Sequence, residues 1–282
     1  MSAGTDTPPT IQGKSCLVDR KQETRDLTVC YPLHMPTYKA KGIVLNTFKL
    51  GEADKIVILF AGSCGKIRAV AKGARKTKSK FGGTLEPFTV ADLLLYEGRS
   101  LDIIQQTDII MSFKEIRSDL EKVKYGSVML ELIDKVAQEG EESHDVFSLL
   151  LAALQCLKET DGGYQTLLTI FQLKLMAVIG YKPHLAQCPA CSGPLPESAK
   201  QYLFSLKYGG MLCDACRGKD PDAVAVSAPT REHIEKALDT PLARWRELDF
   251  STENVKGIAR LTELFVAYHL EHRLKSARLL DI

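Results

Sequence analysis

The sequence predicts an α+β protein of several domains, in which a five-stranded β-barrel precedes an α-helical domain. Three observations predict this class. Five short β-prone runs follow one another between residues 42 and 110, apolar residues recur with helical spacing beyond Phe113, and two Cys-x-x-Cys pairs interrupt the helical part. With 282 residues, of which 45% are hydrophobic and 26% charged, the chain can bury a sizeable core.

Residues 1–34 are expected to form a disordered leader. They contain Thr, Pro, Ser, Gln and mixed charges without a sustained apolar period. They also lack the charged start and the apolar stretch of a secretory signal, and no apolar run of the chain reaches the ~18 residues of a membrane span. We therefore expect a cytoplasmic protein whose ordered part begins near Tyr38.

Residues 35–116 are expected to form the barrel. Turn residues at Gly51-Glu52, at 62–65 and at 97–99 separate the β-prone runs, and a longer excursion lies between the third run and the fourth. Five short strands in about 80 residues, with one long connection, are typical of a small barrel of the OB type. The runs are GIVLNTFKL, DKIVILF, KIRAVAKG, PFTVADLLLY and SLDIIQQTDII.

The long excursion is strongly basic. Residues 71–83 contain five Lys and Arg and no Asp or Glu, although the net charge of the whole chain is only +2. Because like charges repel one another, the fold gains nothing from such a loop unless an anion lies against it. We expect the loop to hold nucleic-acid phosphates, and a merely solvated loop is the alternative. The candidate DNA contacts are Lys66, Lys72, Arg75, Lys76, Lys78 and Lys80.

Aromatic residues are interspersed with these cations. A basic barrel that contains Phe81, Phe88 and Tyr96 has the composition of a single-strand binder, in which rings stack on bases. A place in the barrel core is the alternative for each ring, and for Phe88 it is the preferred one. In the fourth run, Phe88, Val90, Leu94 and Tyr96 share one face of a half-buried strand.

The helical domain is expected in two parts, residues 117–186 and 221–282. One apolar stripe extends from Val146 to Leu157, and another extends from Tyr164 to Leu175 and stops before Gly180. Two later helices are expected, over residues 230–238 and 254–280.

Two further features of the helical part are expected to be structural. His269 and His272 have metal-ligand spacing, but without a matching carboxylate they are more often surface or core residues. Trp245, between two arginines, is expected to be a packing anchor.

Residues 187–220 are expected to form a zinc-binding insertion. Each Cys-x-x-Cys pair places two thiolates on a tight turn, and two converging turns give the tetrahedral sulfur site that Zn²⁺ accepts. Two pairs of free or redox-active thiols are the alternative. Four cysteines leave no open position for water, so the metal, one Zn²⁺ per chain, is expected to be structural. The ligands are Cys188, Cys191, Cys213 and Cys216.

The chain contains none of the common catalytic signatures. No P-loop, GxGxxG, HExxH or GxSxG motif occurs, and nothing nominates a nucleophile. We therefore expect a protein without catalytic residues.

Several segments resemble the bacterial RecO family of recombination mediators. YKAKGIVLNTFKLGEADKIVILF, GKIRAVAKGARKTKSKFGGTLEPF and LLLYEGRSLDII are similar to the N-terminal domain of that family. QLKLMAVIGYKPHLAQCPACSGPL and GGMLCDACR resemble its middle part, where a helix leads into a four-cysteine zinc site.

The resemblance implies an OB-fold, a helical domain and a zinc insertion. It implies DNA repair by annealing complementary strands and by loading a recombinase onto strands coated with single-strand binding protein, within the bacterial nucleoid. The implied partners are single- and double-stranded DNA, RecR, the single-strand binding protein and the recombinase RecA. Carried over by position, Arg75, Lys76, Lys78 and Lys80 match the DNA-contacting loop of the family. Its zinc ligands are matched by Cys188, Cys191, Cys213 and Cys216. Family members usually begin a few residues before the equivalent of YKAKGIVL, so the resemblance implies a natural start at Met35.

Two other classes of function remain open at this point. One is a zinc-ribbon and OB protein that binds structured RNA in translation or ribosome assembly. The other is a nucleic-acid enzyme with a dispersed active site. Preference for single-stranded DNA without turnover separates the mediator from both.

Overall fold

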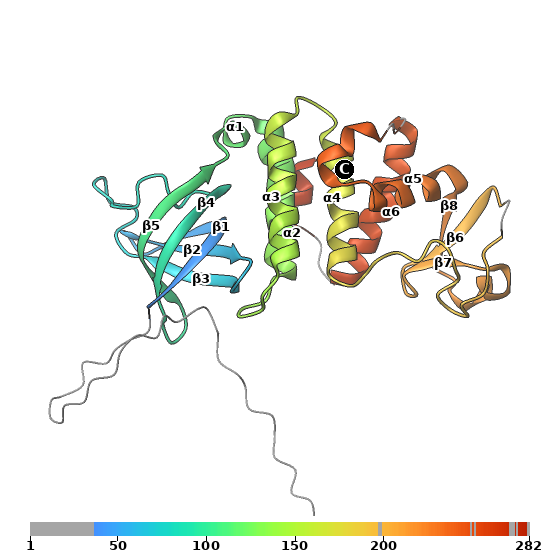
Figure 1. Cartoon of the computed structure of the whole chain (residues 1–282), viewed down its shortest axis with the longest axis horizontal. Coiled ribbons are helices and arrows are strands. Elements are labelled where there is room, and N and C mark those ends of the chain that lie inside the picture. Colours follow the sequence, from blue (N-terminus) through green and yellow to red (C-terminus); the bar gives the residue numbers. More distant parts are fainter. Residues whose placement is uncertain are drawn as a thin grey trace, which may run out of the picture.

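The computed structural model describes residues 37–196, 199–248, 250, 252–270, 274 and 276–280. The expected leader, the expected start at Met35 and His272 lie outside these residues. In Figure 1 the N-terminal sheet, the helices and a small second sheet follow one another along the long axis of the molecule.

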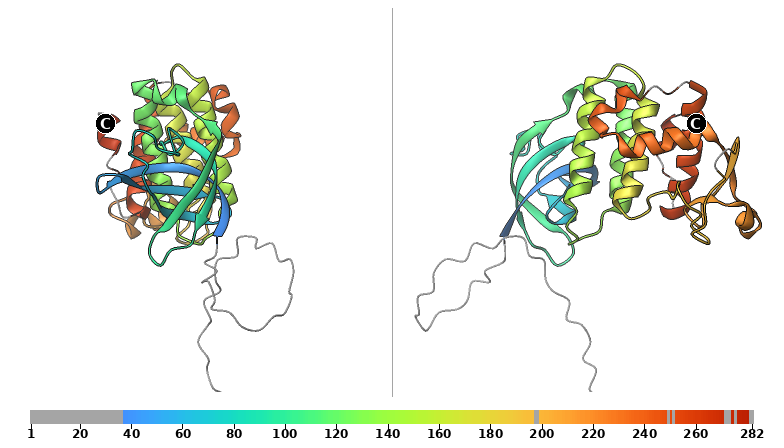
Figure 2. Two further views of the ribbon diagram at one scale, coloured as in Figure 1. Left: turned by 90° about the vertical axis from the view of Figure 1, so that its left-hand side faces the viewer. Right: turned by 45° about the vertical axis from the view of Figure 1, so that its right-hand side comes forward.

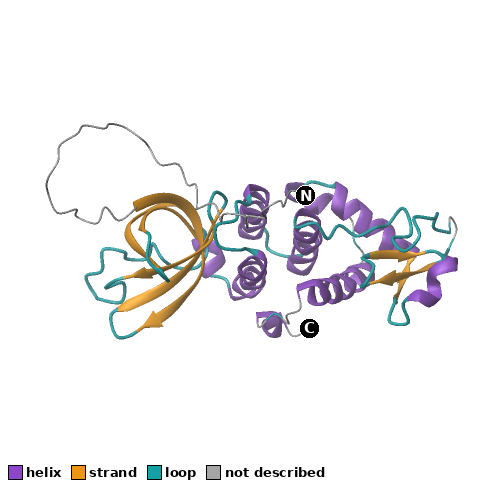
Figure 3. Cartoon of the chain, turned by 90° about the horizontal axis from the view of Figure 1, so that it is seen from below, coloured by secondary structure: helices purple, strands orange, loops and turns teal. Residues whose placement is uncertain are grey.

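Five strands form the N-terminal sheet, as expected. They are β1 (Thr37–Leu50), β2 (Asp54–Ala61), β3 (Gly65–Ala71), β4 (Thr89–Tyr96) and β5 (Asp102–Ser112). The strands pair in the order β1-β2-β3-β5-β4, and β4 pairs with β1. This curved sheet has its weakest seam between β3 and β5, which share two parallel residue pairs (Figure 3). The order and the thin seam fit the partly open OB arrangement.

A bend in β1 lets this strand serve two neighbours. Its first half pairs with β4 as far as Ile43, and its second half pairs with β2 up to Leu50. The register shifts between Val44 and Asn46, and such a bulge bends the strand. Lys49 near the end of β1 pairs with Lys55 of β2, which pairs with Ala71 at the end of β3, so the end of β1 and the loop after β3 lie at the same end of the sheet.

The interior face of β4 is the opposite of the expected one. Ala91, Leu93 and Leu95 project into the barrel core, whereas Phe88 and Val90 project outward into the helical core. The apolar pattern did not distinguish the faces because helices cover the outer face at the start of the strand, so both faces are buried there.

The helices form one layered group beside the sheet, shown from two further sides in Figure 2. They are α1 (Lys114–Arg117), α2 (Leu120–Val136), α3 (His144–Glu159), α4 (Tyr164–Val178), α5 (Ala228–Asp239) and α6 (Thr252–Leu270), with 3₁₀ turns η1 (Asp214–Lys219), η2 (Leu242–Glu247) and η3 (Ser276–Leu280).

Two of the helix predictions need correction. The sequence did not predict α2, which packs against β1, α3 and α4. The single helix expected over residues 254–280 is wrong, because α6 ends at Leu270 and a separate 3₁₀ turn begins at Ser276.

The barrel is joined to the helices through backbone hydrogen bonds. In the turn between β2 and β3, the Lys66 N–H donates to the carbonyl of Gln138 at 2.9 Å, and the Cys64 carbonyl accepts the Gly140 N–H at 3.1 Å. Gly65 has φ of 69°, and a Cβ there would lie 2.2 Å from the Gln138 carbonyl oxygen. A glycine is therefore required where this turn meets the loop between α2 and α3.

The second sheet lies at the far end of the helices from the barrel (Figure 1). It comprises β6 (Gln201–Ser205), β7 (Gly210–Leu212) and β8 (Val224–Ser227), paired antiparallel in the order β7-β6-β8. Phe204 of β6 meets Phe265 of α6 edge to face, at 5.5 Å between ring centroids, so this sheet packs on the helical core.

Candidate metal centre and nucleic-acid interface

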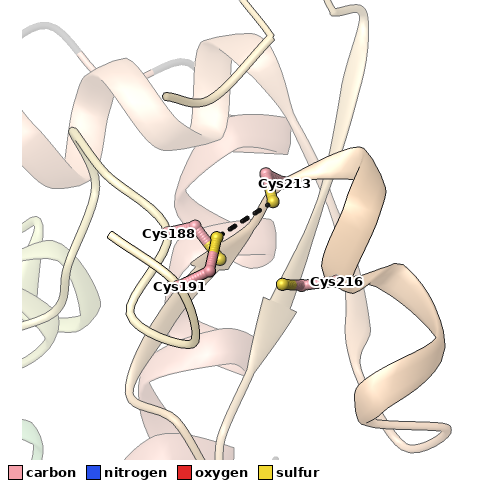
Figure 4. A group of neighbouring side chains, drawn as sticks. All are labelled: Cys188, Cys191, Cys213 and Cys216. Atoms are coloured by element: carbon pink, nitrogen blue, oxygen red, sulfur yellow. Dashed lines mark hydrogen bonds between the residues drawn. The ribbon is translucent and has the colours of Figure 1, made fainter. Parts of the chain in front are cut away.

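The four cysteines predicted as ligands come together at one point beside the second sheet. Their sulfur atoms all lie within 4.8 Å of one another, and the Sγ atoms of Cys191 and Cys213 are 3.5 Å apart. Figure 4 shows the four side chains pointing toward a common centre from two segments of the chain. Cys188, Cys213 and Cys216 are buried, whereas Cys191 is exposed.

Local backbone geometry turns each pair of thiols toward that centre. In the first pair, the Ser192 N–H donates to the Cys188 carbonyl at 2.7 Å, and Ser192 has the unusual φ of 58°. The Gly193 N–H donates to the Cys191 sulfur at 3.4 Å. In the second pair, the Cys216 N–H donates to the Cys213 carbonyl at 3.0 Å, just after β7 ends.

The thiols influence one another's ionisation. Burial raises the pKa of Cys188. Hydrogen bonds from the backbone of Cys213 and Ala190 and from the neighbouring thiols outweigh this effect, and the pKa falls to about 6. Burial, and then the neighbouring sulfurs, raise the pKa of Cys216 to about 12. The surroundings therefore favour the thiolate of Cys188 and disfavour those of Cys213 and Cys216, whose pKa is raised, and a cation at the centre of the cluster would stabilise all of these thiolates.

The donor set fits a metal ion. Bonds of about 2.3 Å from a tetrahedral Zn²⁺ to sulfur place the four sulfurs about 3.8 Å apart, so small side-chain movements within the 4.8 Å cluster reach that geometry. Four soft thiolates favour Zn²⁺ or an iron–sulfur centre over Mg²⁺ or Ca²⁺. The cluster can hold a metal ion.

The predicted basic loop lies at the end of the barrel away from the helices (Figure 1). Lys72, Lys76 and Lys78 are exposed, and among the described residues their ammonium groups have no ion-pair partner. Three unneutralised charges lie within seven residues of chain, which makes this loop attractive to an anion.

Two other cations of the loop also anchor it. Nη1 of Arg75 donates to the Gly51 carbonyl at 2.7 Å, and Nζ of Lys80 donates to the Gln105 carbonyl at 2.8 Å. Phe81, 1% exposed, inserts into the barrel core beneath the loop. The loop is thus held on the barrel at three points while most of its charge faces solvent.

Lys66 is separated from the other predicted DNA contacts. It lies at the start of β3, whereas the basic loop follows the end of that strand. Its Nζ is 3.2 Å from Oδ1 of Asp134 in α2, so the lysine links the barrel to the helices.

The rings considered for stacking lie mostly in the core. Phe81 is buried in the barrel core, as the alternative interpretation held, whereas Phe88 is buried outside the barrel, in the helical core, and Tyr96 is half-buried. Phe48 in β1, which the sequence pattern did not single out, is 51% exposed. The polar residues Asn46 and Lys49 near it are exposed, and their presence in the sequence was the available indication that this end of the strand faces solvent.

The remaining singled-out residues are structural where they are described. Trp245 is buried, and its ring would touch a Cβ at Gly163 within 3.0 Å. His269 packs between the rings of Tyr181 and Phe265, with centroids 4.5 and 4.6 Å away. Burial lowers the pKa of His269, which suits a neutral ring in a packed position.

Comparison with known families gives a match along almost all of the described chain. The model described as "Recombination protein O N terminal" matches residues 35–113, and that described as "Recombination protein O C terminal" matches residues 117–278. The chain belongs to the recombination protein O (RecO) family. The resemblance seen in the sequence is thereby confirmed.

The matches to curated relatives in this family cover nearly the whole length of each relative. A DNA repair protein RecO from Bifidobacterium adolescentis is 38% identical over 252 residues, which is 88% of this chain and 100% of the relative. That from Nocardioides sp. is 40% identical over 243 residues, 85% of this chain and 97% of the relative. That from Alkaliphilus metalliredigens is 32% identical over 233 residues, 83% and 94% of the two chains.

Among the helices that the structure describes, none is both long enough and apolar enough to cross a membrane.

Proposed function

We propose that this chain is a DNA repair and recombination mediator that binds single-stranded DNA, anneals complementary strands and helps load the recombinase onto strands coated with single-strand binding protein. Its membership of the RecO family, whose relatives carry the name DNA repair protein, supports this function. The structural observation that carries it is the basic loop, whose unpaired cations face solvent beside the barrel.

Annealing makes no covalent bond, so the protein has to supply electrostatics and access. Two phosphate backbones repel each other, and lysines that neutralise some of these phosphates release condensed counterions and weaken the repulsion. Phosphate contacts position a strand without reading its sequence, so the bases stay free to pair. The exposed ammonium groups of Lys72, Lys76 and Lys78 suit this role, and we expect no catalytic residues.

The cysteine cluster is proposed to hold one structural Zn²⁺. With four thiolates bound, the ion has no open coordination position and supplies folding energy in place of chemistry. Cys188, Cys191, Cys213 and Cys216 would hold it, fastening the segment before β6 to the end of β7.

The proposed setting is the bacterial nucleoid in the cytoplasm. The proposed partners, beyond single- and double-stranded DNA, are RecR, the single-strand binding protein and RecA, and they rest on the family resemblance. The family match does not favour the alternative of an RNA-binding protein of translation or ribosome assembly.

An annealing assay tests this function. Two complementary oligonucleotides, one with a fluorophore and one with a quencher, are mixed at nanomolar concentration with and without the protein. We expect the protein to accelerate quenching, to bind the unpaired strand more tightly than structured RNA of equal length, and to leave both strands intact. Absence of acceleration at protein concentrations that saturate the strand would contradict annealing, and cleavage would indicate an enzyme.

A further inference from the structure

A row of apolar side chains crosses the outer face of the barrel. Phe48 in β1 pairs with Ile56 in β2, Ile56 pairs with Val70 in β3, and Val70 pairs with Ile103 in β5. Directly opposed residues project to the same face of a sheet. We call these four residues the outer row.

The outer row faces away from the barrel core. Val57, Ala69, Ala71 and Ile104, which flank its members along the chain, are buried in that core. Because successive side chains alternate between faces, the row itself projects outward. Phe48 is 51% exposed, Val70 and Ile103 are half-buried, and Ile56 is half-buried and packs against the helical core. A single exposed apolar residue is ordinary, but a row continuous over four strands is not.

Cations flank the outer row on both sides. In β3, exposed Arg68 precedes Val70 by two residues, and exposed Lys72, directly after the end of the strand, follows it by two. Among the described residues, neither of these side chains has a hydrogen-bond or ion-pair partner. Positive charges beside an apolar strip complement a polyanion that carries apolar rings.

The basic loop is fixed beside Phe48. Arg75 donates from Nη1 to the Gly51 carbonyl at 2.7 Å and from its backbone N–H to the Ala53 carbonyl at 2.9 Å. These carbonyls belong to the turn that follows β1, three and five residues after Phe48. The loop cations and the exposed ring therefore share one end of the sheet.

A cavity of about 380 Å³ adjoins Phe48 on the opposite side, toward α2. Leu45, Pro87 and Leu130 contribute apolar walls, and Glu131 and Asp134 contribute carboxylates. Its size is within the range of small-ligand pockets. Lys135 also lines the cavity, and Lys66 pairs with Asp134, so the cavity holds charges of both signs, whereas residues 71–83 of the loop hold only cations. A strand crossing Phe48 therefore has its phosphates toward the loop and its base edges toward the cavity.

We propose that the outer row is the base-contacting surface of the single-strand site, and that the Phe48 ring stacks on an unpaired base. This inference rests on the proposed function and adds the surface that receives the bases. The lysines and arginines around the row hold the backbone, and the ring holds a base in a sequence-tolerant way, because every base has a π-face. Phe48 is thus a DNA-binding residue.

The test compares Phe48→Ala, Phe48→Trp and, as the control, Tyr268→Ala, which removes an aromatic ring of similar exposure (49%) from α6. Each protein is titrated with an unstructured oligonucleotide and with the same oligonucleotide carrying abasic positions, at several salt concentrations. Circular dichroism and thermal melting check folding.

We expect Phe48→Ala to weaken binding of the intact strand roughly 5- to 150-fold, the range of one stacked base. The dependence of affinity on salt should stay unchanged, because no phosphate contact is lost. Abasic positions should weaken the wild type and spare Phe48→Ala. Phe48→Trp should retain affinity, and its emission should be quenched by DNA, since the chain's single Trp, Trp245, is buried.

Each contrary result points to a different error. Wild-type protein that does not bind single strands contradicts the proposed function itself. Wild-type binding with an unaffected, folded Phe48→Ala overturns the stacking inference alone. A reduced salt dependence in Phe48→Ala means that the ring only supports the loop. A change of oligomeric state without a change of DNA affinity assigns the outer row to a contact between protein chains.

Discussion

Cations of the barrel divide into two kinds once their partners are known. The ammonium groups of Lys55 and Lys66 contact Glu86 at 2.9 Å and Asp134 at 3.2 Å. Those of Lys72, Lys76 and Lys78 have no such partner among the described residues. A paired lysine already has its charge compensated, so only the second kind gains much from binding a phosphate. The sequence predicted the basic loop but could not separate Lys66 from it, because Asp134 lies 68 residues further along the chain.

The four cysteines of the candidate metal centre were the most predictable residues of the site. Two Cys-x-x-Cys pairs give the chemistry and the spacing together, whereas the burial of three thiols and the exposure of Cys191 depend on the surrounding sheet.

Cys216→Ser should reduce the bound metal to far below one ion per chain, because a hydroxyl is a poor substitute for a thiolate ligand. Cys156→Ser is the matched control, since Cys156 is also a buried free cysteine but lies in α3, away from the cluster. Elemental analysis of protein purified without chelator measures both. Metal content near zero in the wild type, or unchanged in Cys216→Ser, contradicts the metal centre. Metal affinity should also fall as the pH falls, because protons compete for the thiolates.

Elements of the fold were predictable where their own side chains carry a clear period. The five strands lie between turn residues, and the apolar stripes of α3 and α4 are continuous. Helix α2 was missed because Lys122 and Gly126 lie on its buried side and interrupt the stripe. Gly126 is needed there because a Cβ would lie 2.7 Å from the ring of Phe88. Such a contact between distant segments leaves no periodic signal in the sequence.

The turn that joins the barrel to the helices can be tested by substitution of Gly65. Gly65→Ala should destabilise the protein by on the order of 3 kcal/mol, because positive φ and a clash with the Gln138 carbonyl act together. Gly51→Ala is the matched control: φ there is 58°, but nothing lies within 4 Å of the added Cβ, so the cost should be about 1 kcal/mol. Urea denaturation of both variants measures the difference. An equal loss of unfolding free energy in both variants would mean that the backbone near Gln138 moves to accommodate the added methyl group.

For the whole molecule, the order of sheet, helices and cysteine cluster followed from the sequence, but the proposed nucleic-acid interface did not. The exposure of Phe48 and its alignment with Ile56, Val70 and Ile103 arise from pairings between strands, which local patterns do not specify. The same pairings bring the turn after β1 under the basic loop. The interface is thus a property of the folded barrel, while its charge is already visible in residues 71–83.

The salt dependence of DNA binding tests the central claim most directly, that unpaired cations of the basic loop hold the phosphates of single-stranded DNA. A variant with Lys72, Lys76 and Lys78 replaced by alanine is titrated with an unstructured oligonucleotide at several salt concentrations, beside the wild type and the paired-lysine control Lys66→Ala. Each lost phosphate contact lowers the slope of log affinity against log salt by ~0.7, so the triple variant should lose about 2. Lys66→Ala should leave the slope nearly unchanged. A folded triple variant with the slope and affinity of the wild type would show that the loop is merely solvated and that DNA binds elsewhere.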